Sequence, residues 1–240
     1  MNAYMNAPAH SRRGTGSARS GALRTFCLML LLLFMTGVFL GVNLGRSDRF
    51  ASLFDRMAEL FSFADKGGNI PGNIQLPPFI EEELLTVNPY SRPGEALASV
   101  NAVVIHYVGN PGTTAEQNRS YFQGLADSGA TSASSNLIVG LEGETLLCVP
   151  LNEVAYCSNS RNNDTVSIEF CHPDDTGEPT QATYDALVRL TAWLCGQFGL
   201  DPTKDVIRHY DVIGKECPRY YVQNEDAWMQ FKLDVSAAMD

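Results

Sequence analysis

The chain has 240 residues, of which 45% are hydrophobic and 18% are charged, and its formal net charge is −10. Four of the 17 basic residues lie before residue 25, whereas all 27 acidic residues lie after residue 45. Because nucleic-acid binding depends on a basic surface, this distribution excludes nucleic acid as a partner of the larger, acidic part of the chain.

The N-terminal residues predict a membrane anchor. Residues 1–24 form a basic tail without an acidic residue, and residues 25–45 carry no charge. An apolar stretch of about 20 residues is long enough to cross a bilayer core, and it exceeds the roughly 7–15 apolar residues of a secretory signal. We therefore expect an uncleaved transmembrane helix in the cell membrane, with the tail in the cytoplasm and the rest of the chain outside. Cleavage of this segment would instead give a secreted form.

A linker separates this segment from one globular domain. Within residues 46–77, apolar residues recur at helical spacing from Phe50 to Phe61. This pattern predicts a juxtamembrane amphipathic helix that lies on the membrane or on a partner, or that serves as a stalk. Glycine, proline and asparagine then dominate residues 66–78, as in linkers. Residues 78–240, about 160 in number, suffice for one domain with a single core.

The rest of the sequence contains both strand and helix patterns, which predicts an α/β domain. Residues 136–140 and 144–149, with a turn between them, predict a hairpin. The clearest helix pattern, residues 182–198, carries its apolar side chains on one stripe that should cover the sheet. Thr114 and Gln117 have the spacing of a capping box and start another helix. The predicted elements are strands at 101–108, 136–140, 144–149 and 165–171, and helices from 114 to about 126, over 182–198, and from 225 to about 235.

Histidine and cysteine side chains indicate a metal site. His209 and Cys217 lie in the polar stretch 207–218, and His106 lies within the strand pattern 101–108. Imidazole nitrogen and thiolate sulfur suit a tetrahedral Zn²⁺, and three protein ligands with an open fourth position are typical of catalytic zinc. The alternatives are a hydrogen-bonded core histidine and a cysteine that packs as a small hydrophobe, since the spacing of His209 and Cys217 matches no tight metal signature.

Two further polar residues are candidates for catalysis. On the predicted strand 165–171, Glu169 shares a face with Ser167, so it is either a general base or a surface glutamate. In an extended segment, Lys215 would point the same way as Cys217, and it would then either stabilise an oxyanion or remain a solvated loop lysine. Of the six cysteines in the chain, five follow residue 45. That number allows one metal ligand with up to two disulfides, or free thiols.

Five sequence blocks in order resemble the zinc-dependent N-acetylmuramoyl-L-alanine amidases, which share a fold with peptidoglycan recognition proteins and phage amidase-type lysozymes. The resemblance covers about residues 78–235. It implies a mixed central β-sheet flanked by helices, so that with the N-terminal segment the expected fold class is α/β preceded by a single transmembrane helix. The blocks are residues 103–114, 136–143, 149–155, 163–169 and 208–218.

The resemblance also implies a reaction and a role for each candidate residue. The zinc ligands would be His106, His209 and Cys217, the base would be Glu169, and Lys215 matches the lysine two residues before the last ligand. The expected reaction is hydrolysis of the amide between N-acetylmuramic acid and the L-alanine of the stem peptide, with peptidoglycan as substrate. One alternative is a module that binds peptidoglycan fragments without cutting them, although such modules typically lose a ligand. A scaffold that docks a partner through the amphipathic helix is a third alternative.

Two positions depart from the pattern of the family. Ser135 stands where some relatives carry a tyrosine near the site, which argues against a tyrosine-assisted mechanism and gives Glu169 more importance. Tyr156 and Cys157 stand where many relatives carry an aromatic residue followed by histidine. The sequence does not predict an oligomeric state.

Overall fold

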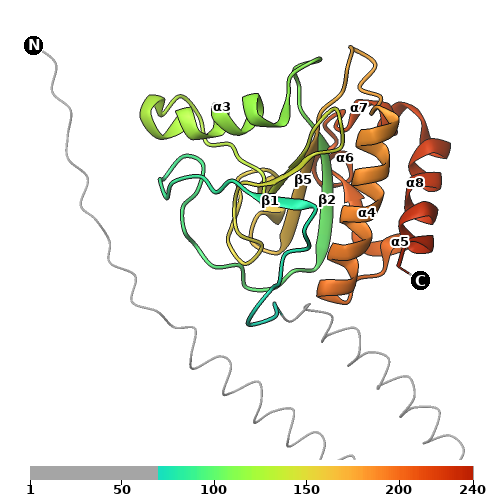
Figure 1. The fold of residues 1–240 in the computed structure, drawn as a ribbon, viewed down its shortest axis with the longest axis horizontal. Helices are drawn as coiled ribbons and strands as arrows, with labels where there is room; N and C mark the ends of the chain where they lie inside the picture. Colours follow the sequence, from blue (N-terminus) through green and yellow to red (C-terminus); the bar gives the residue numbers. More distant parts are fainter. Residues whose placement is uncertain (1–69, 240) are drawn as a thin grey trace, which may run out of the picture. The chain divides into compact units, whose positions relative to one another are not determined.

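The structure, a computed structural model, describes residues 70–239 and contains one mixed β-sheet (Figure 1). Its strands are hydrogen-bonded in the order β1-β4-β3-β5-β2-β6. β3 and β4 are antiparallel, and the other four neighbouring pairs are parallel. The strands are β1 (Ile80–Glu82), β2 (Ala102–Tyr107), β3 (Leu137–Val139), β4 (Thr145–Leu147), β5 (Thr165–Phe170) and β6 (Val206–Arg208).

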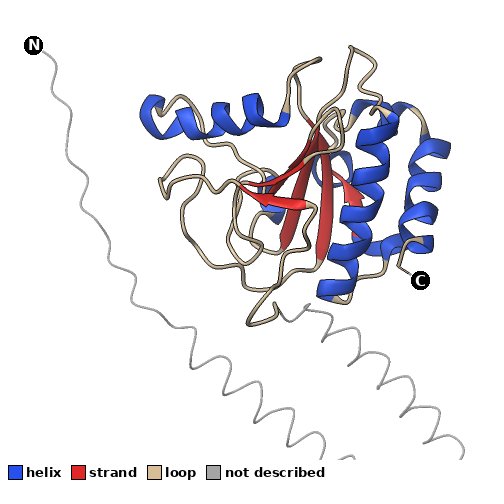
Figure 2. Ribbon diagram, viewed as in Figure 1, coloured by secondary structure: helices blue, strands red, loops and turns tan. Residues whose placement is uncertain are grey.

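Helices flank the sheet on both sides (Figure 2). α4 packs against one face over the larger apolar cluster, and α8 packs against α4. α3 lies over the opposite face, where Phe122 and Leu125 join a second cluster with Ile138. The helices are α3 (Ala115–Ser128), the 3-10 helix η1 (Asn159–Arg161), α4 (Gln181–Phe198), α5 (Pro202–Asp205), α6 (His209–Ile213), α7 (Arg219–Gln223) and α8 (Glu225–Ala237).

The two central strands decide which side of the sheet carries polar groups. Ile105 of β2 and Ile168 of β5 belong to the cluster under α4. Successive side chains of a strand point to opposite faces, so the next residues, His106 and Glu169, face away from α4. These two residues are partners in the parallel register of β2 and β5. Polar side chains therefore meet on the α3 side of the sheet.

Two predicted helices are confirmed together with their caps. Thr114 Oγ1 accepts from the backbone N–H of Gln117 at 3.3 Å, and the Gln117 side chain accepts from the N–H of Thr114 at 3.0 Å, which completes the capping box of α3. α4 carries the predicted buried stripe and ends at Gly199, whose φ of 65° is left-handed. Glycine adopts that conformation without steric cost.

The predicted fold class needs one correction, which concerns the transmembrane helix. No helix within residues 70–239 combines the length and the apolar composition needed to cross a bilayer. α4 is the longest of the described helices at 18 residues, but only one of its faces is buried and its exposed side is polar. The anchor predicted at 25–45 lies outside the described residues, as do the tail 1–24 and the amphipathic helix expected around Phe50 to Phe61. The fold class is therefore a mixed sheet flanked by helices.

Several short elements were not predicted. β1 and β6 have three residues each, and unlike the equally short β3 and β4 they belong to no hairpin whose turn would mark them. Within the polar stretch 207–218, for which the sequence predicts no helix, His209 begins α6. The reason is local, because the carboxylate of Asp211 accepts from the backbone N–H of Arg208 at 2.8 Å and caps the first turn.

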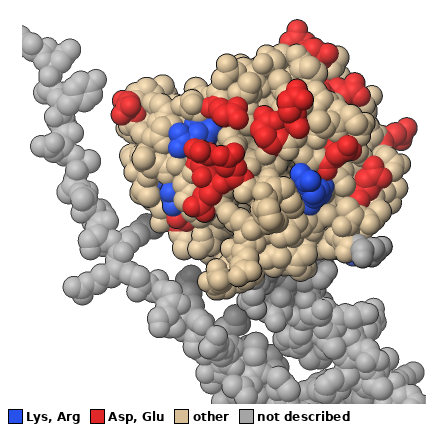
Figure 3. All heavy atoms as spheres, viewed as in Figure 1, with Lys and Arg blue, Asp and Glu red and all other residues tan. Residues whose placement is uncertain are grey.

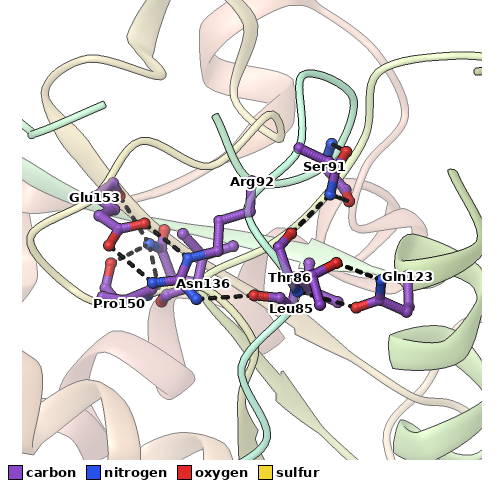
Figure 4. Close-up of polar contacts among 10 residues, drawn as sticks. Leu85, Thr86, Ser91, Arg92, Gln123, Asn136, Pro150 and Glu153 are labelled. Carbon is purple, nitrogen blue, oxygen red and sulfur yellow. Dashed lines mark hydrogen bonds and ion pairs between the residues drawn. The ribbon is translucent and has the colours of Figure 1, made fainter. Parts of the chain in front are cut away.

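A polar network fixes the segment between β4 and β5 (Figure 4). Arg92 forms two hydrogen bonds of 2.8 and 2.9 Å to the carboxylate of Glu153 and donates to the carbonyl of Leu85 at 2.8 Å. The Asn136 amide donates to the carbonyls of Pro150 and Glu153, both at 3.2 Å. Bidentate guanidinium–carboxylate pairs are strong and geometrically specific. These bonds hold Pro150 and Glu153 in place, so the segment that precedes residues 154–159 has a fixed position.

The surface of the described domain is acidic, as its composition requires. Acidic side chains dominate the face seen in Figure 3, with only small groups of basic ones.

Candidate active site

His106 lies at the centre of the polar face. It belongs to the central strand β2 and is 2% exposed. Its Nδ1 is 3.9 Å from Sγ of Cys217, and its Nε2 is 3.1 Å from Oγ of Ser158. One ring nitrogen thus faces the cysteine and the other faces a hydroxyl.

His209 reaches the same point because β6 pairs with β2. Arg208, the last residue of β6, is the register partner of Ile105, so the next residue emerges beside His106. The two imidazole rings are 4.5 Å apart between centroids. Arg208 holds this end of the strand, since it donates to the carbonyl of Tyr221 at 3.0 Å and forms an ion pair with Asp211.

Cys217 arrives from the turn after α6. Its carbonyl accepts from the N–H of Tyr210 at 2.8 Å, and its own N–H donates to the carbonyl of Lys215 at 2.7 Å. This tight turn replaces the extended segment considered from the sequence. Lys215 and Cys217 nevertheless line the same cavity.

Three of these side chains could hold a metal ion. The ligand atoms of His106, His209 and Cys217 all lie within 4.8 Å of one another, and all three residues are buried. Zn–N bonds of about 2.0–2.1 Å and a Zn–S bond of about 2.3 Å require donor atoms roughly 3.3–3.6 Å apart in a tetrahedron. The 3.9 Å between His106 Nδ1 and Cys217 Sγ needs only a small contraction to fit. The donor set therefore fits zinc.

A second set of ligands shares His106. Its imidazole, the thiol of Cys157 and the carboxylate of Glu169 also lie within 4.8 Å of one another. The first set offers two imidazoles and one thiol, whereas the second would occupy the carboxylate that is otherwise free to accept a proton. One nitrogen of His106 can bind only one metal ion, so only one of the two sets can hold a metal through that nitrogen.

Glu169 and Lys215 complete the cavity. Burial raises the pKa of Glu169 to about 7, while the hydrogen bond from Cys157 and the positive charge of Lys215 act to lower it. The two side chains and the three candidate ligands line one cavity of about 330 Å³, with Tyr107, Phe122 and Tyr156 among its apolar walls. All five site residues predicted from the sequence are therefore brought together.

A sequence comparison decides which family this arrangement belongs to. Residues 96–220 match the profile of the family described as N-acetylmuramoyl-L-alanine amidase. The chain belongs to this family.

Curated relatives agree with this membership, and a solved structure shares the fold. The amidase domain is 33% identical over 178 residues to N-acetylmuramoyl-L-alanine amidase BlyA of Bacillus subtilis (strain 168), covering 65% of this chain and 46% of that protein. It is 31% identical over 172 residues to N-acetylmuramoyl-L-alanine amidase CwlL of Bacillus licheniformis, covering 67% and 47%. The chain thus spans about half the length of these relatives. The catalytic domain of XlyA has the same fold, with a TM-score of 0.55 at 24% identity, covering 65% of this chain and 98% of that domain.

The electrostatics of the candidate site favour neutral imidazoles. Burial lowers the pKa of His106 well below its usual range, and the charges of His209 and Lys215 lower it further. Burial and Lys215 also lower the pKa of His209. Burial raises the pKa of the Cys217 thiol to about 12. A metal ligand must be a neutral imidazole or a thiolate, so the histidines are ready to bind and the cysteine must lose a proton.

Sequence reasoning missed two residues of the candidate site. Ser158 contacts His106, and the side-chain oxygen of Asn159 is 2.7 Å from Nε2 of His209. Asn159 is also the one non-glycine residue between 70 and 239 with a positive φ, 54°. Asparagine tolerates this conformation better than most residues, so the three asparagines among residues 159–163 were a usable signal.

The structure also shows the state of the cysteines and the surroundings of Ser135 and Cys157, which depart from the family pattern. The five cysteines of the described residues are free thiols, so no disulfide forms among them. Ser135 is fully buried, and its hydroxyl donates to the carbonyls of Leu137 and Ser167. It serves the packing of β3 against β5. Cys157 lies on the cavity wall beside Glu169.

Proposed function

We propose that this chain is a zinc-dependent amidase that hydrolyses the amide bond between N-acetylmuramic acid and L-alanine of the stem peptide in peptidoglycan. The observation that carries the proposal is the meeting of a His, His, Cys ligand set with a carboxylate and an ammonium in one cavity. Membership of the amidase family supports the same reaction. We assign the activity to residues 78–240.

In this proposal the metal is held by His106, His209 and Cys217. Nδ1 of His106 faces Cys217, and Nδ1 of His209 is the ring nitrogen left free by Asn159. A Zn²⁺ ion at these atoms would lower the pKa of water toward about 7 and polarise the carbonyl of the substrate. Lys215, which lines the same cavity, would stabilise the negative charge that develops on the carbonyl oxygen under attack.

Glu169 is the proposed general base. Its carboxylate projects from the rigid strand β5, and it is the register partner of a proposed ligand, His106. It would take a proton from the attacking water and return it to the leaving amine of L-alanine. A base with a pKa near the working pH suits both steps, because it accepts and releases the proton at little cost.

Peptidoglycan lies outside the cytoplasmic membrane, so we propose that the domain acts there. The aromatic side chains of Tyr107, Phe122 and Tyr156 at the cavity wall provide an apolar surface for a glycan or peptide ligand.

Metal content tests the ligand assignment. We expect mass spectrometry to find one zinc in the purified chain and a sharp loss of zinc in Cys217→Ala. Cys195→Ala is the matched control, since Cys195 is an equally buried free thiol in α4. A folded parent chain without zinc, or a Cys217→Ala variant that keeps its zinc, would contradict the proposal.

A further inference from the structure

Three consecutive residues, Cys157, Ser158 and Asn159, each contact a different functional group of the site. Sγ of Cys157 is 3.8 Å from Oε1 of Glu169, Oγ of Ser158 is 3.1 Å from Nε2 of His106, and Oδ1 of Asn159 is 2.7 Å from Nε2 of His209. We infer that residues 157–159 form a positioning loop, which sets the orientation of both histidines and of the carboxylate. The inference rests on the proposed metal site.

The contacts of the positioning loop select the metal-binding nitrogen of His209 and orient the ring of His106. A neutral imidazole has one N–H donor and one acceptor nitrogen. The amide oxygen of Asn159 can only accept, so the hydrogen bond requires a proton on Nε2 of His209 and leaves the lone pair on Nδ1. The hydroxyl of Ser158 can donate or accept, so it fixes the ring orientation of His106, with Nδ1 toward Cys217, and it can accept from Nε2 when Nδ1 binds a metal. Partners of this kind fix the tautomer and ring orientation of metal-binding histidines.

The positioning loop is itself held in place. Oδ1 of Asn162 accepts from the backbone N–H of Cys157 at 3.1 Å and from that of Ser158 at 2.6 Å. On the N-terminal side, Tyr156 and Ser134 exchange hydrogen bonds of 2.9 and 3.0 Å. Both ends of the loop are thus tied to the domain, so its side chains meet the site in one arrangement.

Asn159 adopts a conformation that only a few residues tolerate. Its φ of 54° is left-handed, and it lies at the exposed rim while its side chain reaches the buried His209. Glycine fits this backbone without strain, whereas alanine does not. Asn159→Gly therefore removes the side-chain contact while it keeps the loop conformation.

Zinc affinity measures the role of the loop directly. Competition with a chelator should show that Asn159→Gly binds zinc about 10–100-fold more weakly than the parent chain. Asn159→Asp keeps an oxygen acceptor at the same position and should bind zinc within a few-fold of the parent. Asn163→Gly is the matched control, because Asn163 is an exposed asparagine of the same segment. It should bind zinc as the parent does.

Ser158→Ala tests the same inference through His106 and should also weaken zinc binding about 10-fold or more. Cys157→Ala tests the third contact. Because Glu169 is not a proposed ligand, this variant should keep the zinc affinity of the parent and lower kcat with little change in KM. Loss of zinc from Cys157→Ala would mean that the metal uses the alternative set and would overturn the inference.

A measurement without metal separates this inference from the proposed function. Nitrogen NMR of the metal-free chain should show the Nε2–H tautomer of His209 in the parent and in Asn159→Asp, and a mixture of tautomers in Asn159→Gly. A parent chain that binds no zinc would overturn the proposed function and this inference with it. A parent that binds zinc, with Asn159→Gly and Ser158→Ala binding it equally well, would overturn the inference alone.

Discussion

Replacing Glu169 with glutamine tests the chemistry of the site most sharply. The change conserves the size and shape of the side chain on β5, so contacts such as that with Cys157 can persist, but an amide cannot accept the proton of the attacking water. A general base contributes about 10²–10⁴ in rate, which corresponds to about 2.7–5.5 kcal/mol of barrier. We therefore expect Glu169→Gln to lower kcat by that factor while zinc content stays at the parent level.

The pKa of Glu169 sets the pH dependence of the same prediction. Burial raises this pKa to about 7, and a cation bound nearby would lower it again. As the pH falls through the pKa, the carboxylate gains a proton and can no longer act as a base. The kcat/KM of the parent should therefore fall on the acid side, with a midpoint at or below about pH 7. This fall in kcat/KM at low pH should be absent from Glu169→Gln.

Release of fragments from labelled peptidoglycan, followed by kinetics on a defined muropeptide, would give both quantities. Glu142→Gln is the matched control, because it makes the same chemical change at an exposed loop position. The reasoning would be refuted by a Glu169→Gln variant as active as the parent. It would be refuted equally by a slow Glu169→Gln variant whose kcat/KM still falls at low pH.

Three further outcomes follow from the site. Burial raises the pKa of Cys217 to about 12, so at pH 7.5 its thiol should release about one proton when zinc binds to the metal-free Glu169→Gln variant, in addition to a fraction of a proton from the zinc-bound water. Calorimetry in buffers of different ionisation enthalpy should therefore measure a release between about one and two protons, and a release clearly below one would contradict a Cys217 ligand. The folded-state pKa of Glu169 is raised above its unfolded value, so its contribution to stability is present below about pH 4.5 and lost as the pH rises through about 7. Urea unfolding of the metal-free parent should therefore lose more stability over that range than Glu169→Gln, and equal losses would contradict this. Arg208→Ala removes the donor to the carbonyl of Tyr221 and the guanidinium that pairs with Asp211 and Glu225, so it should cost about 2–3 kcal/mol in urea unfolding, whereas a cost below about 0.5 kcal/mol would show that these contacts are not stabilising.

Long periodic elements of the fold could be predicted from the sequence. α4 and α8 have enough turns for an apolar stripe to show, and β2 and β5 have six residues each of strand pattern. The three-residue strands β1 and β6 form because neighbouring strands offer hydrogen-bonding edges, a tertiary effect without a local signal. The short helix α6 depends on one carboxylate cap.

The candidate site was predictable where residue type alone restricts the chemistry. The chain has four histidines, and only His106 and His209 lie in segments that could form a site, which made them candidates. The positioning loop was not predictable, because serine and asparagine are common loop residues and their contacts depend on the path of the chain from Glu153 to β5. The membrane-spanning helix predicted for residues 25–45 lies outside the described residues, and none of the helices within residues 70–239 could cross a membrane.

Identification of the bond that is cut tests the central claim most directly. The zinc-loaded chain would be incubated with a purified muropeptide that carries both sugar and stem peptide. The products would be separated and their masses determined by mass spectrometry. The account predicts an intact sugar with a free lactyl carboxylate and a stem peptide with a new amino group on L-alanine. Cleavage at a glycosidic or peptide bond, or binding of the muropeptide without cleavage by the zinc-loaded chain, would contradict it.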